Sequence, residues 1–208
     1  MVAIDDYGFS NSQYLKTVNC PGLRKIGAAA FEGCKILEQI VLYDNVAYIG
    51  KNAFKGCDKL KIICLMAEKP EGWDEDWNPD SCPVEWGYAP VESWEVPQTE
   101  TDNITVKVYS SFENKDMYFF VVGGTGKMYN FSSADPAPWL SYKDLTEYVV
   151  FNDGITEVGS RSFINFVNIK NIYFPKTLTY VSQYAFYNVP LITTLSIPGN
   201  TAIGDSTF

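Results

Sequence analysis

A repeat of 22 or 23 residues constrains the fold of this chain more than any other feature. In each copy an Ile or Val is followed five positions later by Phe, and neighbouring copies place their phenylalanines 22 or 23 residues apart. Six copies form two runs, with their phenylalanines at Phe9, Phe31 and Phe54 and at Phe163, Phe186 and Phe208. Such a repeat is typical of a solenoid, because a single unit cannot bury its own apolar face and has to stack on its neighbours.

Apolar residues at fixed offsets after each Phe predict the structure within one repeat. Phe31, for example, is followed by Cys34, Leu37, Ile40 and Leu42. The positions nine and eleven residues after Phe differ by two, as in a strand, whereas the preceding apolar positions lie three apart, as in a tight helical turn. We therefore expect one short strand and one short helical turn per repeat.

The register of the repeat resembles the BspA-like class of leucine-rich repeats. The resemblance is clearest at residues 26–34 (IGAAAFEGC) and 49–57 (IGKNAFKGC), and it covers roughly residues 4–66 and 145–208. It implies a bacterial or protozoan protein of the cell surface, or a secreted one, often with a role in adhesion or matrix binding. In the second run Phe166 and Val189 take the place of the cysteine, which indicates that this position serves packing.

The interruption between the two runs predicts four regions along the chain. Residues 1–88 form the first leucine-rich repeat array, closed by a cap of residues 67–88 whose tryptophans lie over the last strand. Residues 89–103 are rich in Pro, Thr and Glu and are predicted to be a linker. Residues 104–144 have strand composition around a Gly-rich turn and are predicted to form a small β unit. Residues 145–208 form the second array, which is expected to be truncated because it stops in mid-repeat.

Charge and composition exclude several classes of function. With 16 basic and 25 acidic residues the net charge is −9, which repels nucleic acid and anionic membrane surfaces. There is no apolar run long enough to insert into a membrane and no signal peptide, so an export signal is expected to have been removed. Histidine is absent, which removes the commonest general base and most catalytic zinc sites. We expect a non-catalytic protein without a cofactor.

An acidic stretch in the predicted cap carries the spacing of a calcium-binding loop. Its oxygen-bearing side chains match the ligand positions of such a loop, namely Asp74, Asp76, Asn78, Asp80 and Glu85. Pro79 stands where the loop needs a glycine for its sharp turn, and the flanking residues are not helical. The alternative is a solvated acidic loop. In the same region, a disulfide between Cys64 and Cys82 is an open possibility, whereas Cys34 and Cys57 are expected to be buried thiols.

The outer face of the strands is the predicted contact surface. If the positions nine and eleven residues after Phe face the core, the neighbouring positions face outward. Apolar and aromatic side chains would then gather on this face, namely Val41, Tyr43, Ile62, Met66, Tyr148 and Tyr173. Tyrosines suit recognition because they supply a large amphipathic contact area with few rotatable bonds. The alternative is that the tryptophan-rich cap covers part of this group.

Together these features predict a surface-displayed or secreted module that binds an extracellular protein or glycan. The alternative is a structural spacer within a larger surface protein. A spacer would have a uniformly polar outer face, whereas a binding module would carry an aromatic or charged cluster.

Overall fold

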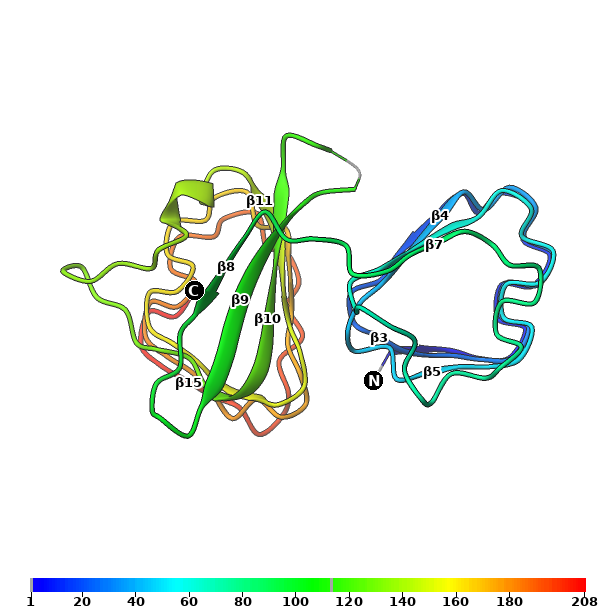
Figure 1. Cartoon of the computed structure of the whole chain (residues 1–208). Helices are drawn as coiled ribbons and strands as arrows, with labels where there is room; N and C mark the ends of the chain where they lie inside the picture. Colours follow the sequence, from blue (N-terminus) through cyan, green and yellow to red (C-terminus); the bar gives the residue numbers. More distant parts are fainter. Residues whose placement is uncertain (1, 113) are drawn as a thin grey trace. The chain divides into compact units, whose positions relative to one another are not determined.

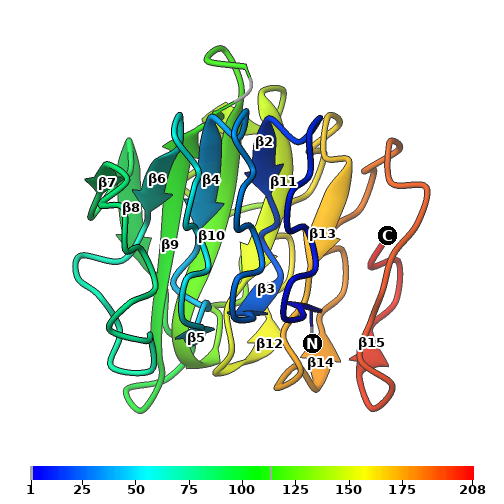
Figure 2. The same cartoon turned by 90° about the vertical axis from the view of Figure 1, so that its right-hand side faces the viewer.

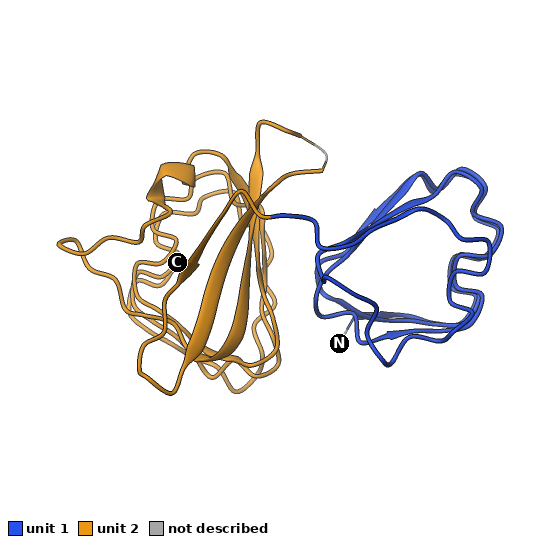
Figure 3. Ribbon diagram, in the orientation of Figure 1, with its two compact units in different colours: residues 1–89 blue, residues 90–208 orange. Residues whose placement is uncertain are grey.

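The computed structural model describes residues 2–112 and 114–208 and divides the chain into two compact units (Figure 3). Unit 1 comprises residues 1–89 and unit 2 comprises residues 90–208. Each unit has its own hydrophobic core. No helix of the described residues is long and apolar enough to cross a membrane.

Unit 1 is a solenoid of parallel strands, whose coils lie one behind another in Figure 1. One sheet has the order β2 (Thr17–Asn19), β4 (Gln39–Leu42), β6 (Lys61–Cys64) and β7 (Val84–Glu85), and Figure 2 shows β2, β4 and β6 side by side. A second sheet has the order β1 (Val2–Ile4), β3 (Leu23–Ile26) and β5 (Tyr48–Ile49). The solenoid prediction is confirmed, but a repeat holds two strands where one was predicted.

The segment that carries the Phe is a series of tight turns, so the predicted helical turn is wrong. The residue two positions before the Phe has a positive φ in every repeat, as at Ala29 (52°), Asn52 (58°) and Arg161 (55°). A left-handed residue interrupts a right-handed helix. The freed amides bond instead to the next coil, as from Phe31 N to Ala53 O at 2.8 Å. The one helix among the described residues is the short 3-10 helix η1 (Leu140–Tyr142).

The phenylalanines of successive repeats form the buried ladder that their spacing predicts. In unit 1 the ring centroids of Phe9 and Phe31 lie 5.6 Å apart and those of Phe31 and Phe54 lie 5.5 Å apart, with interplanar angles of 6°. In unit 2 Phe163 and Phe186 stack at 5.5 Å. These inner rings are fully buried, so each coil closes the apolar face of its neighbour.

The predicted cap continues the rows of unit 1 as a further coil. Trp77 lies in the phenylalanine row, with its ring centroid 5.8 Å from that of Phe54. Trp73 pairs with Ile49 in an isolated parallel bridge, and its indole nitrogen donates to the Val46 carbonyl at 2.9 Å. Both tryptophans are buried.

Four of the five cysteines of unit 1 are buried thiols, and Cys20 is half-buried. The thiol of Cys57 donates to the carbonyl of Phe31 at 3.1 Å, and that of Cys34 to the carbonyl of Phe9 at 3.0 Å, so both bond to the preceding coil. Cys64 is the last residue of β6 and lies in the core, while Cys82 lies against Cys57. All five cysteines are free, so the possible Cys64–Cys82 disulfide is not formed. Burial raises the pKa of both Cys57 and Cys64 to about 12.

Unit 2 begins with an antiparallel hairpin that leads into parallel coils. Strands β8 (Glu92–Glu95), β9 (Asn103–Ser110) and β10 (Tyr118–Lys127) pair in that order. The first half of β10 pairs with β11 (Thr146–Phe151) and its end with β12 (Ile155–Val158). The remaining parallel strands are β13 (Asn171–Tyr173), β14 (Tyr180–Val181) and β15 (Ala202–Ile203).

Two predicted boundaries in this region are wrong. Strand β8 falls within residues 89–103 and is paired with β9, so this segment is part of a sheet and not a linker. The predicted small β unit and second array share one core that runs from Val96 to Val189. The hairpin therefore covers the first coil, because β10 supplies strand positions to both of the sheets that the coils form.

Candidate binding surface

The predicted contact group in unit 1 is not an exposed patch. Ile62 faces the core because it pairs with Ile40 of β4. The segment between Leu60 and Ile62 is one residue shorter than that between Leu37 and Ile40, so the offset from the Phe misassigned its direction. Met66 is partly buried and packs against the same core.

Two further members of that group lie on the outer side of β4 but are also buried. Val41 pairs with Asn19 and Ile63 on either side and lies outside the core cluster, yet its side chain is 1% exposed. Tyr43 is 0% exposed, and its hydroxyl donates to Asn19 Oδ1 at 2.8 Å. The expectation of an exposed group here is therefore wrong.

The predicted tyrosines of unit 2 lie together in an aromatic row. The ring centroids of Tyr148 and Tyr173 are 6.4 Å apart with perpendicular planes. Tyr148 also stacks on Phe119 at 4.9 Å, and Phe119 stacks on Tyr109 at 5.2 Å. Tyr148 and Tyr173 are half-buried, whereas Tyr109 and Phe119 are buried. The repeat spacing located only Tyr148 and Tyr173. The hairpin strands β9 and β10 add Tyr109 and Phe119 to the same row.

The acidic loop attaches its coil to the preceding one. Asp76 forms an ion pair with Lys51 at 3.0 Å, and Asp80 accepts a hydrogen bond from the Gly56 amide at 2.6 Å. Glu85 pairs with Lys61 at 2.6 Å.

The other two predicted calcium ligands bond within the loop itself. Asp74 accepts from the Asp76 amide at 2.8 Å, while the Asn78 side chain bonds to both backbone groups of Cys82. Within residues 2–112 and 114–208 no group of three or more His, Cys, Asp or Glu side chains could hold a metal ion. The five side chains thus point to separate partners and do not converge on one centre.

A groove of about 550 Å³ lies along β12, β14 and β15 in unit 2. Two rows of side chains border it because equivalent residues of successive coils stand side by side. The first row follows the ladder of paired strand residues, of which Glu157 and Tyr180 line the groove. The second row lies just beyond the strands and holds Asn130, Ser160, Gln183 and Asp205. Small residues lie between the rows, as at Ser182 and Gly204, so the floor stays low.

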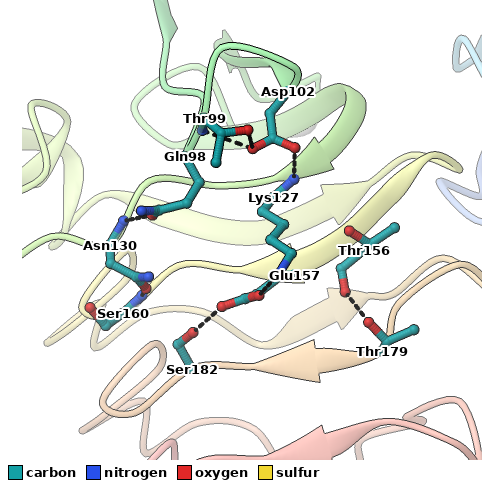
Figure 4. Close-up of polar contacts among 10 residues, drawn as sticks. All are labelled: Gln98, Thr99, Asp102, Lys127, Asn130, Thr156, Glu157, Ser160, Thr179 and Ser182. Atoms are coloured by element: carbon teal, nitrogen blue, oxygen red, sulfur yellow. Dashed lines mark hydrogen bonds and ion pairs between the residues drawn. The ribbon is translucent and has the colours of Figure 1, made fainter.

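Part of the groove is held by internal hydrogen bonds (Figure 4). The Glu157 carboxylate accepts from the Ser182 hydroxyl at 3.1 Å and pairs with Lys127 at 3.4 Å. Asn130 Oδ1 accepts from the backbone amide of Ser160 at 2.7 Å, and the backbone amide of Asn130 donates to Gln98 Oε1 at 2.9 Å. These bonds fix the walls before any ligand arrives.

Other polar groups of the groove face solvent. Within the part of the chain that the structure describes, the side chains of Tyr180, Gln183 and Asp205 make no hydrogen bond or ion pair. Gln183 and Asp205 are exposed and Tyr180 is half-buried. They are available to a ligand.

Sequence reasoning missed this groove. The signal was present as a small residue followed by a polar one in VGSRSF, VSQYAF and IGDSTF of the second run. That pattern does not predict that the two rows border a groove, because the groove depends on how the coils stack.

The chain is similar to known proteins in its repeats and in its fold. A family model described as "BspA type Leucine rich repeat region" matches in six copies over residues 1–69 and 140–208. No curated protein matches. A leucine-rich repeat protein from Eubacterium ventriosum is 18% identical with a TM-score of 0.42, covering 54% of this chain and 28% of that one. A leucine rich cell surface protein from Faecalibacterium prausnitzii is 19% identical with a TM-score of 0.32, covering 99% and 39% respectively. The chain thus spans less than half the length of both solved proteins.

Proposed function

From the premise that this chain belongs to the BspA-type leucine-rich repeat family, we propose that it is a non-catalytic binding module, surface-displayed or secreted, for an extracellular protein or glycan. A stacked repeat presents equivalent side chains of successive coils as a broad, rigid surface. Such a surface loses little conformational freedom when a partner binds, which favours affinity.

The groove of unit 2 is the observation that carries this proposal. Its volume of about 550 Å³ is within the usual range for ligand sites. Its walls are fixed by the Glu157 and Asn130 hydrogen bonds, while the side chains of Gln183 and Asp205 are exposed and make no hydrogen bond to any other described residue. A purely structural spacer does not need a groove that has both fixed walls and polar groups facing solvent.

The half-buried tyrosines of the aromatic row support the protein arm of the proposal. Tyr148 and Tyr173 contact each other, and each retains some exposed surface. Tyrosine is enriched among the residues that dominate binding energy at protein interfaces.

The direct test is binding of the purified chain to arrays of extracellular matrix proteins and of glycans. We expect saturable binding to at least one member. Matched variants then separate the two surfaces: Gln183→Ala with Asp205→Ala changes the groove, and Tyr148→Ala with Tyr173→Ala changes the aromatic row. Loss of binding in one pair locates the site. Absence of binding on both arrays would refute a binding module and support a spacer.

A further inference from the structure

We propose that the groove of unit 2 binds a neutral oligosaccharide, which lies across the coils between Asn130 and Asp205 (Figure 4 shows Asn130 and the fixed wall). This inference rests on the proposed function and deepens it, because it names both the class of ligand and the residues that contact it.

The solvent-facing groups of the groove have the chemistry that sugar hydroxyls require. A hydroxyl both donates and accepts a hydrogen bond, so it pairs with amides and carboxylates alike. Gln183 supplies a carbonyl oxygen and an NH₂ group, and Asp205 supplies two acceptor oxygens that suit neighbouring hydroxyls. The Asn130 oxygen is engaged by the Ser160 amide, which leaves its NH₂ group to donate. An apolar ligand would bury these groups without partners, which is unfavourable.

Tyr180 adds an apolar surface to this polar set. Its hydroxyl oxygen lies 3.1 Å from the position that a Cβ on Gly204 would take, so the side chain extends along the floor of the groove. An amphipathic ring of this kind packs against the C–H face of a sugar while its hydroxyl remains free to bond. Any side chain at position 204 would also collide with the backbone of Ser182 and Gln183, so glycine is needed to keep the floor low.

The charge of the groove separates neutral from anionic sugars. Glu157 and Asp205 are acidic, no Lys or Arg of the described residues lines the groove, and Lys127, which lies next to Glu157, is already paired with it. The chain as a whole carries a net charge of −9. Sulfated and sialylated sugars would therefore meet like charge as they enter, which lowers their affinity.

The repeat also matches the form of an extended chain. Neighbouring strands of a sheet lie about 4.8 Å apart, a distance close to the length of one sugar unit. Gln183 and Asp205 occupy equivalent places in adjacent coils, since β14 pairs with β15 in parallel. Successive sugar units can thus meet equivalent positions of successive coils, and the fixed walls add little ordering cost.

The experiment uses the whole chain on an array of neutral glucans, mannans, galactans and N-acetylhexosamine oligosaccharides, each with a sulfated or sialylated counterpart. Titration calorimetry with the best neutral oligosaccharide then gives Kd. We expect the neutral members to be preferred. Gln183→Ala with Asp205→Ala should weaken binding at least about tenfold, which corresponds to 1.4 kcal/mol, and Tyr180→Ala should weaken it similarly.

The matched control is Gln13→Ala with Asp116→Ala, which changes the same residue types at exposed positions outside the groove. This variant should keep Kd within about twofold, and circular dichroism checks that every variant folds. Preference for the anionic sugars, or an unchanged Kd in the groove variants, would overturn the inference. Binding only to a protein or a lysine-rich peptide would overturn it while leaving the proposed function intact. Absence of any ligand on glycan and protein arrays would overturn both.

Discussion

Replacing Phe54 with alanine measures how much one rung of the phenylalanine ladder stabilises unit 1. The ring is fully buried and lies between Phe31 at 5.5 Å and Trp77 at 5.8 Å. Emptying a buried aromatic site costs about 3–5 kcal/mol, from lost transfer energy and the cavity that remains. Each of the two ring pairs contributes about 0.5–1.5 kcal/mol beyond buried area, which places the expected loss in the upper half of that range.

Two companion variants divide this loss into its parts. Phe54→Leu keeps an apolar side chain and removes both ring pairs, so we expect a loss of about 1–3 kcal/mol. Phe9→Ala changes a ring of the same row that is 43% exposed and stacks on Phe31 alone. Full burial of a Phe side chain contributes about 1.5–3 kcal/mol. Half of that together with one ring pair gives an expected loss of about 1–3 kcal/mol.

The assay is urea unfolding followed by tryptophan fluorescence, because Trp73 and Trp77 lie next to the altered site. Phe163→Ala, the equivalent change in unit 2, serves as the control for which unit unfolds. A loss below about 1 kcal/mol for Phe54→Ala would match an ordinary surface substitution. That result, or equal losses for Phe54→Ala and Phe9→Ala, would refute the ladder as the main source of stability in unit 1.

Four further results are expected. Iodoacetamide at pH 8 should label Cys57 in urea but not in the native state, and equal rates would contradict its burial. Burial raises its pKa from 9.0 to about 12, so the associated stability is fully present below pH 9 and is lost as the pH rises toward 12, which urea midpoints across this range would show. Gly124→Ala should cost more than about 1 kcal/mol in urea unfolding, since φ is +103° and a Cβ would meet the Asn103 carbonyl, whereas Gly199→Ala, in open space, should cost less than about 0.5 kcal/mol. Millimolar calcium should leave Tm unchanged, because Asp76 and the other acidic-loop side chains bond to separate partners; a calcium-dependent rise in Tm would contradict this.

The acidic loop and the predicted contact face are two cases in which the spacing of residues along the chain was not enough to predict where their side chains lie. The spacing of Asp74 to Glu85 matched a calcium loop, but spacing along a chain does not state which way each side chain turns. In the structure Asp80 caps the turn at Gly56 and Glu85 reaches Lys61, because this segment is a coil stacked on its neighbour. The same stacking decides that Ile62 faces inward, since strand pairing aligns it with Ile40 whatever its distance from Phe54.

The sequence by itself determined the solenoid, its two runs and the buried rows of Phe and Cys. This is possible because each coil contacts mainly its neighbours, so a residue repeated in phase along the chain is repeated in space. The phenylalanine row continues to Trp77, which lies 23 residues after Phe54. Only the tertiary structure decided that residues 92–95 join a sheet and that one long strand, β10, serves two coil positions. It also created the groove beside Gln183 and Asp205. These features depend on hydrogen bonds between segments that are not copies of the same repeat. They also depend on how the coils stack, and stacked coils tolerate turns that differ in length by one residue.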